Sequence, residues 1–128
     1  MEKLALVALG GAVGSMARYL AGIAAGRLVR LSAPWLGTFA VNVVGSCLMG
    51  FLIGYLAHRG GAGQERWRLL LAVGVLGGFT TFSSFSLDTA LMIERRAYGP
   101  AALYIAGSVA LSIGALFVGL IAARRLFA

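Results

Sequence analysis

Four long apolar runs divide this sequence, and their length constrains the fold more than any other feature. They cover roughly residues 4–26, 34–57, 69–93 and 101–123. A helix needs about 20 apolar residues to cross the hydrocarbon core of a bilayer. The runs therefore predict an all-α integral membrane protein with four transmembrane helices, at about residues 3–29, 34–58, 66–95 and 99–126.

Charged residues are scarce in this chain. Only 12% of the residues are charged, against about 25% in ordinary soluble domains. Most of the basic residues behind the net charge of +7 lie between the apolar runs, where lysine and arginine anchor helix ends to lipid headgroups. We therefore expect a single membrane domain over residues 1–128, embedded in the lipid bilayer, and no nucleic-acid partner.

The sequence offers little for catalysis. With one cysteine, Cys47, and one histidine, His58, it has no internal disulfide framework and no cysteine-based metal cluster. The apolar runs contain no Ser/His/Asp set and no phosphate-binding loop. We therefore predict that the protein is not an enzyme.

Basic residues flank the runs on both sides of the membrane. One side holds the N-terminus, the second loop and the C-terminus, and the basic residues of the two sides are Lys3, Arg59, Arg66, Arg68, Arg124 and Arg125 against Arg27, Arg30, Arg95 and Arg96. Because lysine and arginine set orientation, so small a bias predicts insertion in both orientations. Opposite copies would then pair in an antiparallel, dual-topology homodimer; a single fixed topology is the alternative.

Two strongly polar residues lie within the first two runs, where polar groups are costly and often functional. Arg18 shares a helix face with Gly10 and Gly14, and it either attracts an anion or snorkels to the membrane surface. Asn42 carries an amide that either donates to a permeating anion or bonds a neighbouring helix. The sequence favours neither interpretation for Arg18, and it slightly favours the packing role for Asn42.

Hydroxyl groups recur along the fourth run. Tyr104, Ser108 and Ser112 are spaced four residues apart, so they lie on one face of a helix. Serines in helices often bond their own backbone, but three hydroxyls on one face indicate a polar track.

The third run contains the segment GGFTTFSSFS at residues 77–86. Its paired glycines and threonines disfavour a helix, so we expect a break near 77–81 and a restart near Ser83. Unpaired carbonyls at such a break suit a cation, and its amides and hydroxyls suit an anion. Phe82 and Phe85 share a face of the restarted helix and either turn their electropositive ring edges to a small anion or pack as core residues beside a kink.

These features resemble the CrcB/Fluc family of fluoride channels over essentially the whole chain. The resemblance rests on GGAVGSMARY at 10–19, NVVGS at 42–46 and the highly specific GGFTTFSSFS. It implies a fluoride-selective, multi-pass channel of the inner (plasma) membrane that exports fluoride passively, as an antiparallel homodimer with two pores. The competing hypotheses are a dual-topology small transporter, which would need a carboxylate that the first run lacks, and a non-transporting structural subunit.

The resemblance also implies roles for individual residues. Arg18 would lie at a pore vestibule, and the backbone carbonyls of Gly77 and Thr80 would bind a structural sodium ion (Na+) at the dimer interface. The family usually has a glutamate near the position of Asp88, whose shorter carboxylate reaches less far. The implied fluoride pore consists of Phe82, Phe85, Asn42, Ser108, Ser112, Tyr104, Thr81, Ser83 and Ser84.

Overall fold

The computed structural model describes residues 1–28, 35–61 and 63–127, and this part of the chain is helical apart from short connections. The helices are α1 (Glu2–Leu28), α2 (Trp35–Arg59), α3 (Gln64–Trp67), the π-helix η1 (Arg68–Leu76), α4 (Gly77–Phe79), α5 (Phe82–Glu94) and α6 (Tyr98–Phe127). The expected end of the first helix at 29 and start of the second at 34 lie outside the described residues, as does Arg30.

Four helical stretches are long and apolar enough to cross a membrane, which confirms the prediction of four spans in an all-α protein. They are Glu2–Arg27, Trp35–Arg59, Gln64–Glu94 and Tyr98–Phe127. The third span is assembled from α3, η1, α4 and α5. Large hydrophobic side chains are exposed along the outer faces of the spans, as lipid surroundings permit because acyl tails are as apolar as leucine.

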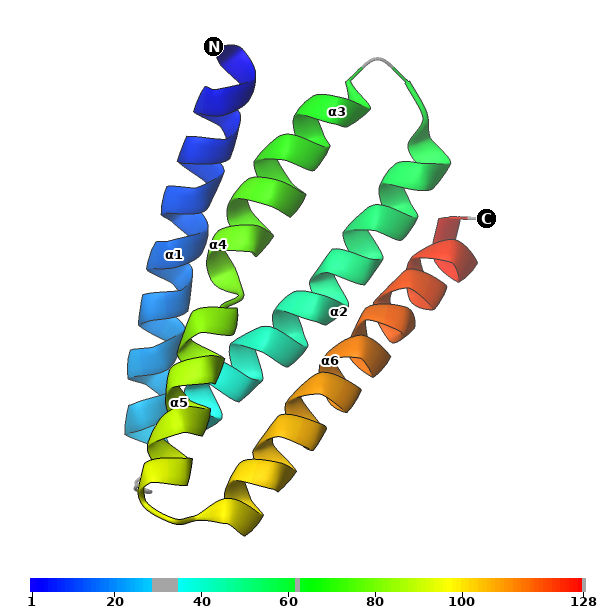
Figure 1. Ribbon diagram of the computed structural model, residues 1–128. Coiled ribbons are helices and arrows are strands. Elements are labelled where there is room, and N and C mark those ends of the chain that lie inside the picture. Colours follow the sequence, from blue (N-terminus) through cyan, green and yellow to red (C-terminus); the bar gives the residue numbers. More distant parts are fainter. Residues whose placement is uncertain (29–34, 62, 128) are drawn as a thin grey trace.

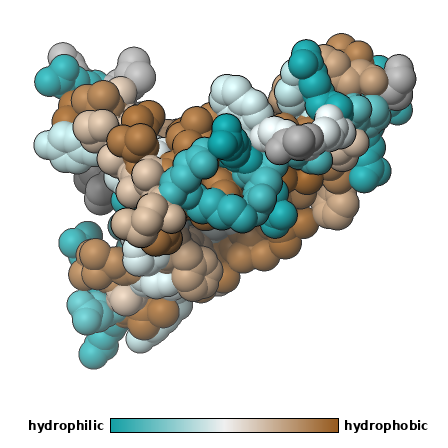
Figure 2. All heavy atoms as spheres, turned by 90° about the horizontal axis from the view of Figure 1, so that it is seen from above, coloured by the Kyte–Doolittle hydropathy of each residue, from teal (hydrophilic) through white to brown (hydrophobic). Residues whose placement is uncertain are grey.

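The spans pack as two pairs (Figure 1). In one pair α1 lies along η1 and α4, and in the other α2 lies along α6. The N-terminus, the connection between α2 and α3, and the C-terminus lie toward the same end of the molecule (Figure 1). Seen along the spans, hydrophilic groups gather in separate patches between brown hydrophobic side chains (Figure 2).

Glycines set the distance between α1 and the third span. A Cβ atom added at Gly10 would meet the Cα of Gly74 at 2.9 Å, and one added at Gly78 would meet the carbonyl oxygen of Gly11 at 2.6 Å. An added Cβ at Gly14 would likewise meet the backbone of the third span. The two backbones therefore touch directly, which is the contact that small residues allow between membrane helices.

Glycines also allow α2 and α6 to pack closely, and each of the two helices contributes one. A Cβ at Gly50 of α2 would collide with the carbonyl oxygen of Leu116, and one at Gly119 of α6 would collide with the carbonyl oxygen of Cys47. These reciprocal contacts fix the position of α2 along α6. As a result, the polar residues of the two helices face the same space.

The helical path of the third span is interrupted at two threonines. Thr80 has φ −80° and ψ 156°, Thr81 has φ −151° and ψ 114°, and α5 begins at the next residue. Gly77 keeps helical angles of φ −64° and ψ −36°. The glycines stay helical because Gly78 packs on α1, and the extended conformation falls on β-branched residues that favour it. The π-helix η1 lies just before this interruption, and no pattern in the sequence predicted it.

Two exposed ion pairs join the start of α1 to α3. The Lys3 ammonium lies 2.6 Å from the Glu65 carboxylate, and the Arg66 guanidinium lies 2.8 Å from the Glu2 carboxylate. Exposed pairs each contribute about 0–1 kcal/mol. Their main consequence is that the carboxylates of Glu2 and Glu65 are already engaged.

Candidate functional site

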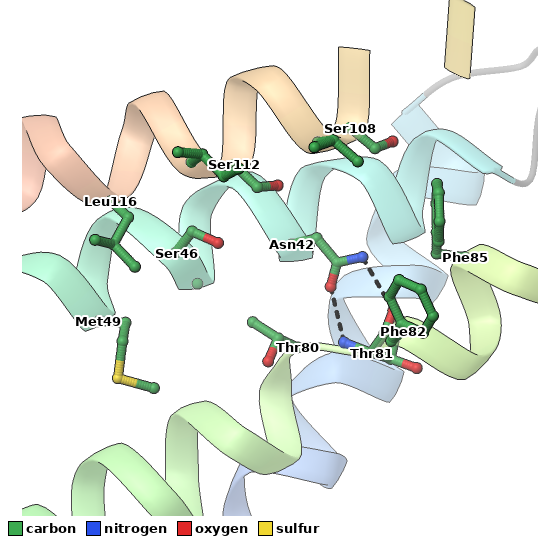
Figure 3. Close-up of a pocket in the computed structure, with 13 residues that line it drawn as sticks. Asn42, Ser46, Met49, Thr80, Thr81, Phe82, Phe85, Ser108, Ser112 and Leu116 are labelled. Carbon is green, nitrogen blue, oxygen red and sulfur yellow. Dashed lines mark hydrogen bonds between the residues drawn. The ribbon is translucent and has the colours of Figure 1, made fainter. Parts of the chain in front are cut away.

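A pocket of about 350 Å³ lies where α2, α5 and α6 meet the two extended threonines. It is partly open, and its walls are largely apolar; the side chains that line it are drawn in Figure 3. Residues from all four of these parts of the chain line it: Asn42, Gly45, Ser46, Met49, Thr80, Thr81, Phe82, Phe85, Ser108, Val109, Ser112, Ile113 and Leu116. The structure thus brings together six of the predicted pore residues from three different spans.

Asn42 is bonded to both backbone groups of Thr81 (Figure 3). Its Nδ2 donates to the Thr81 carbonyl oxygen at 3.0 Å, and the Thr81 N–H donates to its Oδ1 at 2.7 Å. Since the two partners are a donor and an acceptor, they fix which way the amide points. The second hydrogen of the Asn42 amide has no bond among the described residues, and Asn42 lines the pocket, so the packing and donor interpretations are compatible.

Thr81 also organises the start of α5. Its side-chain oxygen accepts a hydrogen bond from the Ser84 N–H at 3.2 Å, as a helix N-cap does. The same hydroxyl lies 3.1 Å from the Ser83 hydroxyl and donates to the Ser84 hydroxyl at 3.2 Å. The predicted hydroxyl track at Thr81, Ser83 and Ser84 is therefore one connected cluster, of which Thr81 lines the pocket.

The aromatic rings form a row that leads away from the pocket. The Phe82 and Phe85 ring centroids are 5.3 Å apart, and the Phe85 and Tyr104 centroids are also 5.3 Å apart. The Trp35 and Tyr104 ring centroids are 5.4 Å apart in an edge-on contact. Phe85 is buried within this row, whereas Phe82 is 76% exposed.

Two serines of α6 face the pocket across from Asn42 (Figure 3). The Ser108 residue is 6% exposed, and its buried hydroxyl oxygen has no hydrogen-bond partner among the described residues. Elsewhere the Ser86 and Thr89 hydroxyls bond carbonyl oxygens of their own helix. An unsatisfied buried hydroxyl costs about 1–3 kcal/mol, so the Ser108 hydroxyl lowers the stability of this chain unless a polar partner reaches it.

Some predicted site residues lie outside this pocket. The Tyr104 hydroxyl points elsewhere and donates to the Asp88 carboxylate at 3.3 Å. Arg18 is half-buried on α1, and Gly77 is exposed on α4; neither belongs to the described pocket lining. Asp88 is thus placed as a partner of Tyr104.

Sequence reasoning did not select Ser46 and Met49, which also line the pocket. Ser46 follows Asn42 by four residues, so the helical repeat places both on one face of α2. That spacing was the signal available for Ser46. Met49 had no such signal, because one methionine in an apolar run is indistinguishable from a packing residue.

Comparisons with known proteins agree on one family. The family model described as CrcB-like protein, Camphor Resistance (CrcB), matches residues 5–120. Proteins named Fluoride-specific ion channel FluC are similar over their full length: those of Phenylobacterium zucineum and Caulobacter vibrioides are each 63% identical over 128 residues, covering 100% of both chains. The protein of that name from Agrobacterium fabrum is 54% identical over 127 residues, covering 99% of this chain and 100% of its own.

The family model, over residues 5–120, includes the second and third apolar stretches whole and most of the first and fourth. With four helices able to cross the bilayer, the chain is a multi-pass protein of the cell membrane, and it belongs to the CrcB-like family.

Proposed function

We propose that this protein is a fluoride-selective channel that lets fluoride leave the cell passively. The proposal further holds that it works as an antiparallel, dual-topology homodimer with two pores and a central structural sodium ion. Full-length relatives that carry the name of a fluoride-specific ion channel support the substrate. The geometry of the pocket supports how the substrate is bound.

The observation that carries the proposal is the unpartnered Ser108 hydroxyl. Ser108 lines the pocket together with Asn42, which carries an amide, and Ser112, which carries a second hydroxyl. These groups can all donate, and the described lining of the pocket contains no carboxylate. A cluster of neutral donors without a negative charge favours an anion over a cation.

Neutral donors suit fluoride in particular. Fluoride is small and strongly hydrated, so a pathway must replace its water with several donors while still letting the ion leave. The Phe82 and Phe85 rings add electropositive edges beside the hydroxyls and the amide. A fixed cation in the pocket would hold the ion too tightly, and Arg18 lies outside the described lining, consistent with a role at a vestibule.

A second copy of the chain would complete the site. Phe82 projects from its own protomer with 76% of its surface exposed, although it lines the pocket. The pocket is partly open, and a partner helix would supply the missing wall. Two antiparallel copies would close two such pockets, and each pore would then draw residues from both subunits.

The donor set at the interruption fits a sodium ion. Because the Thr81 N–H donates to Asn42, it is withdrawn from the carbonyl of Gly77. Carbonyl oxygens at the ends of interrupted membrane helices are ligands for sodium, and the C-terminal end of α4 carries partial negative charge. The described residues hold no group of three or more His, Cys, Asp or Glu side chains. Gly77 and Thr80 of each copy would therefore hold the ion through their backbone carbonyl oxygens. The ion would in turn balance the partial negative charge of these oxygens.

The remaining predicted pore residues take supporting places in this scheme. Ser83 and Ser84 hold the Thr81 hydroxyl at the pocket. The Tyr104 ring packs against Phe85, and the Tyr104 hydroxyl donates a hydrogen bond to the Asp88 carboxylate. In this scheme the Asp88 carboxylate is bonded to that hydroxyl and does not face the anion.

Passive efflux from liposomes tests the proposal. Purified protein is reconstituted with internal fluoride, a potassium ionophore balances charge, and chloride-loaded liposomes are the matched control. Fast release of fluoride without release of chloride is the expected result. A folded protein that releases neither ion would refute the channel and favour a structural subunit. Fluoride release that occurs only when a proton gradient is imposed would favour a coupled transporter.

A further inference from the structure

A second pocket, of about 540 Å³, lies at the end of the molecule where α2 gives way to α3. Leu52, Leu56 and Leu71 supply an apolar wall on the membrane side. Tyr55 and Trp67 supply aromatic surface. Tryptophan and tyrosine are enriched where a membrane protein meets the headgroup layer, so we expect the pocket to lie at the depth of lipid headgroups.

Arg59 supplies the charge of this pocket. It is the last residue of α2, and its guanidinium carbon lies 5.3 Å from the centroid of the Tyr55 ring. Tyr55 is itself held by Phe127, whose ring centroid is 4.8 Å away. A guanidinium stacked on a ring keeps its N–H edges free, and those edges match the oxygens of a phosphate.

The charges around the pocket favour an anion. Arg59 is the charged residue among the described lining residues, and no carboxylate belongs to that lining. The acidic residue nearest to Arg59 in sequence, Glu65, is paired with Lys3, and Glu2 is paired with Arg66.

The end of α2 does not oppose an anion as strongly as a bare helix end would. Terminal carbonyl oxygens carry partial negative charge. Here Gln64 Nε2 donates to the Leu56 carbonyl at 2.8 Å. One of these terminal oxygens is therefore matched by a side-chain nitrogen before any ligand arrives.

The mouth of the pocket is open. Gly60 and Gly61 have positive φ angles of 45° and 127°, which turn the chain away from α2 without side chains. A Cβ built at either position, or at Gly63, would meet no atom within 4 Å. Trp67 at the rim is 56% exposed. A headgroup can therefore enter from the membrane surface.

From this combination we propose that the pocket binds an anionic phospholipid of the surrounding bilayer. Arg59 bonds the phosphate, Trp67 and Tyr55 flank the glycerol region, and one acyl chain lies along the leucine wall. In an antiparallel pair of copies, one such site would face each leaflet. Apolar walls leading to a basic pocket between spans are the features with which membrane proteins retain anionic lipids.

Tryptophan quenching by brominated lipids tests this site without measuring ion flux. The chain has two tryptophans, so Trp35→Phe leaves Trp67 as the sole reporter. The full-length Trp35→Phe protein is reconstituted into phosphatidylcholine with brominated phosphatidylglycerol or brominated phosphatidylcholine. We expect brominated phosphatidylglycerol to occupy the site of Trp67 about five-fold more strongly, the factor that one basic residue gives at an anionic surface.

Two further variants test whether Arg59 is responsible for the preference for phosphatidylglycerol. Arg59→Gln in the same background should bring the ratio close to one. Arg27→Gln is the matched control, because Arg27 is also an exposed arginine at a helix end but lies on α1 at the far end of the bundle. This control should keep the five-fold ratio.

Each contrary result overturns the site. Equal quenching by both lipids would mean ordinary boundary lipid, and a preference that survives Arg59→Gln would place the anionic lipid elsewhere. Protection of Trp67 from both lipids would mean that a second copy of the chain covers the pocket. Displacement of the lipid by inorganic phosphate would indicate a site for a free anion.

Discussion

The side chain of Asn42 pairs with both backbone groups of Thr81, at 3.0 Å and 2.7 Å. A side chain of α2 thereby replaces the helical hydrogen bonds that the extended backbone of the third span cannot make. Inside a bilayer an unsatisfied backbone group costs several kcal/mol, so this one amide makes the interruption tolerable. It also ties the position of α5, with its phenylalanines, to that of α2.

The first prediction concerns Asn42→Asp, which keeps the shape of the side chain and removes its donor. The Thr81 carbonyl loses its partner, and a negative charge enters the pocket. Loss of one buried hydrogen bond costs about 1–3 kcal/mol, so we expect the melting temperature to drop. Because the negative charge repels the anion, we also expect fluoride efflux from liposomes to fall about ten-fold or more. Full efflux from the variant would exclude Asn42 from the pathway.

The second prediction separates the two phenylalanines. Phe82 is exposed and Phe85 is buried against Tyr104. Phe82→Ile should lower fluoride efflux roughly ten-fold, equivalent to about 1.4 kcal/mol, with little change in melting temperature. Phe85→Ile should lower both. Phe117→Ile, at an exposed position of α6 outside the described lining of the pocket, is the control. If Phe82→Ile conducts like this control, its ring has no role in permeation.

The third prediction is that removing one buried hydroxyl does not lower the stability of the protein. Ser108→Ala removes a buried hydroxyl that has no partner among the described residues, so stability should stay constant or rise by up to about 1–3 kcal/mol. Fluoride efflux should nevertheless fall, because the pocket loses a donor. Ser86→Ala, which removes an exposed hydroxyl bonded to its own helix, is the control. A clear loss of stability in Ser108→Ala would show that the hydroxyl has a structural partner instead.

The fourth prediction tests the packing that positions the pocket. An added methyl at Gly50 meets the Leu116 backbone, whereas one at Gly114 meets nothing within 4 Å. Gly50→Ala should destabilise the protein by about 1–3 kcal/mol through overpacking. Gly114→Ala should stabilise it by about 0.5–1 kcal/mol, because alanine is the better helix former. Thermal unfolding in detergent measures both. Similar melting temperatures for the two variants would contradict the close approach of α2 and α6.

The sequence by itself determined the number of spans. Twenty or so consecutive apolar residues can satisfy their backbone groups inside a bilayer only as a helix, so composition and length were sufficient. Helical periodicity likewise placed Ser108 and Ser112 on one face of the fourth span. The four-residue spacing of Asn42 and Ser46 carried the same information for the second span, although Ser46 was not selected.

Tertiary structure decided what local propensity could not. Gly77 and Gly78 disfavour a helix in isolation, yet they remain helical, with Gly78 held in contact with α1. The extended residues are Thr80 and Thr81, and Asn42 bonds the backbone of Thr81 from 39 residues away. No pattern within one span reports such a partner. The physical reason is that a membrane helix is interrupted only where another segment supplies the missing hydrogen bonds, and which segment does so depends on how the spans pack.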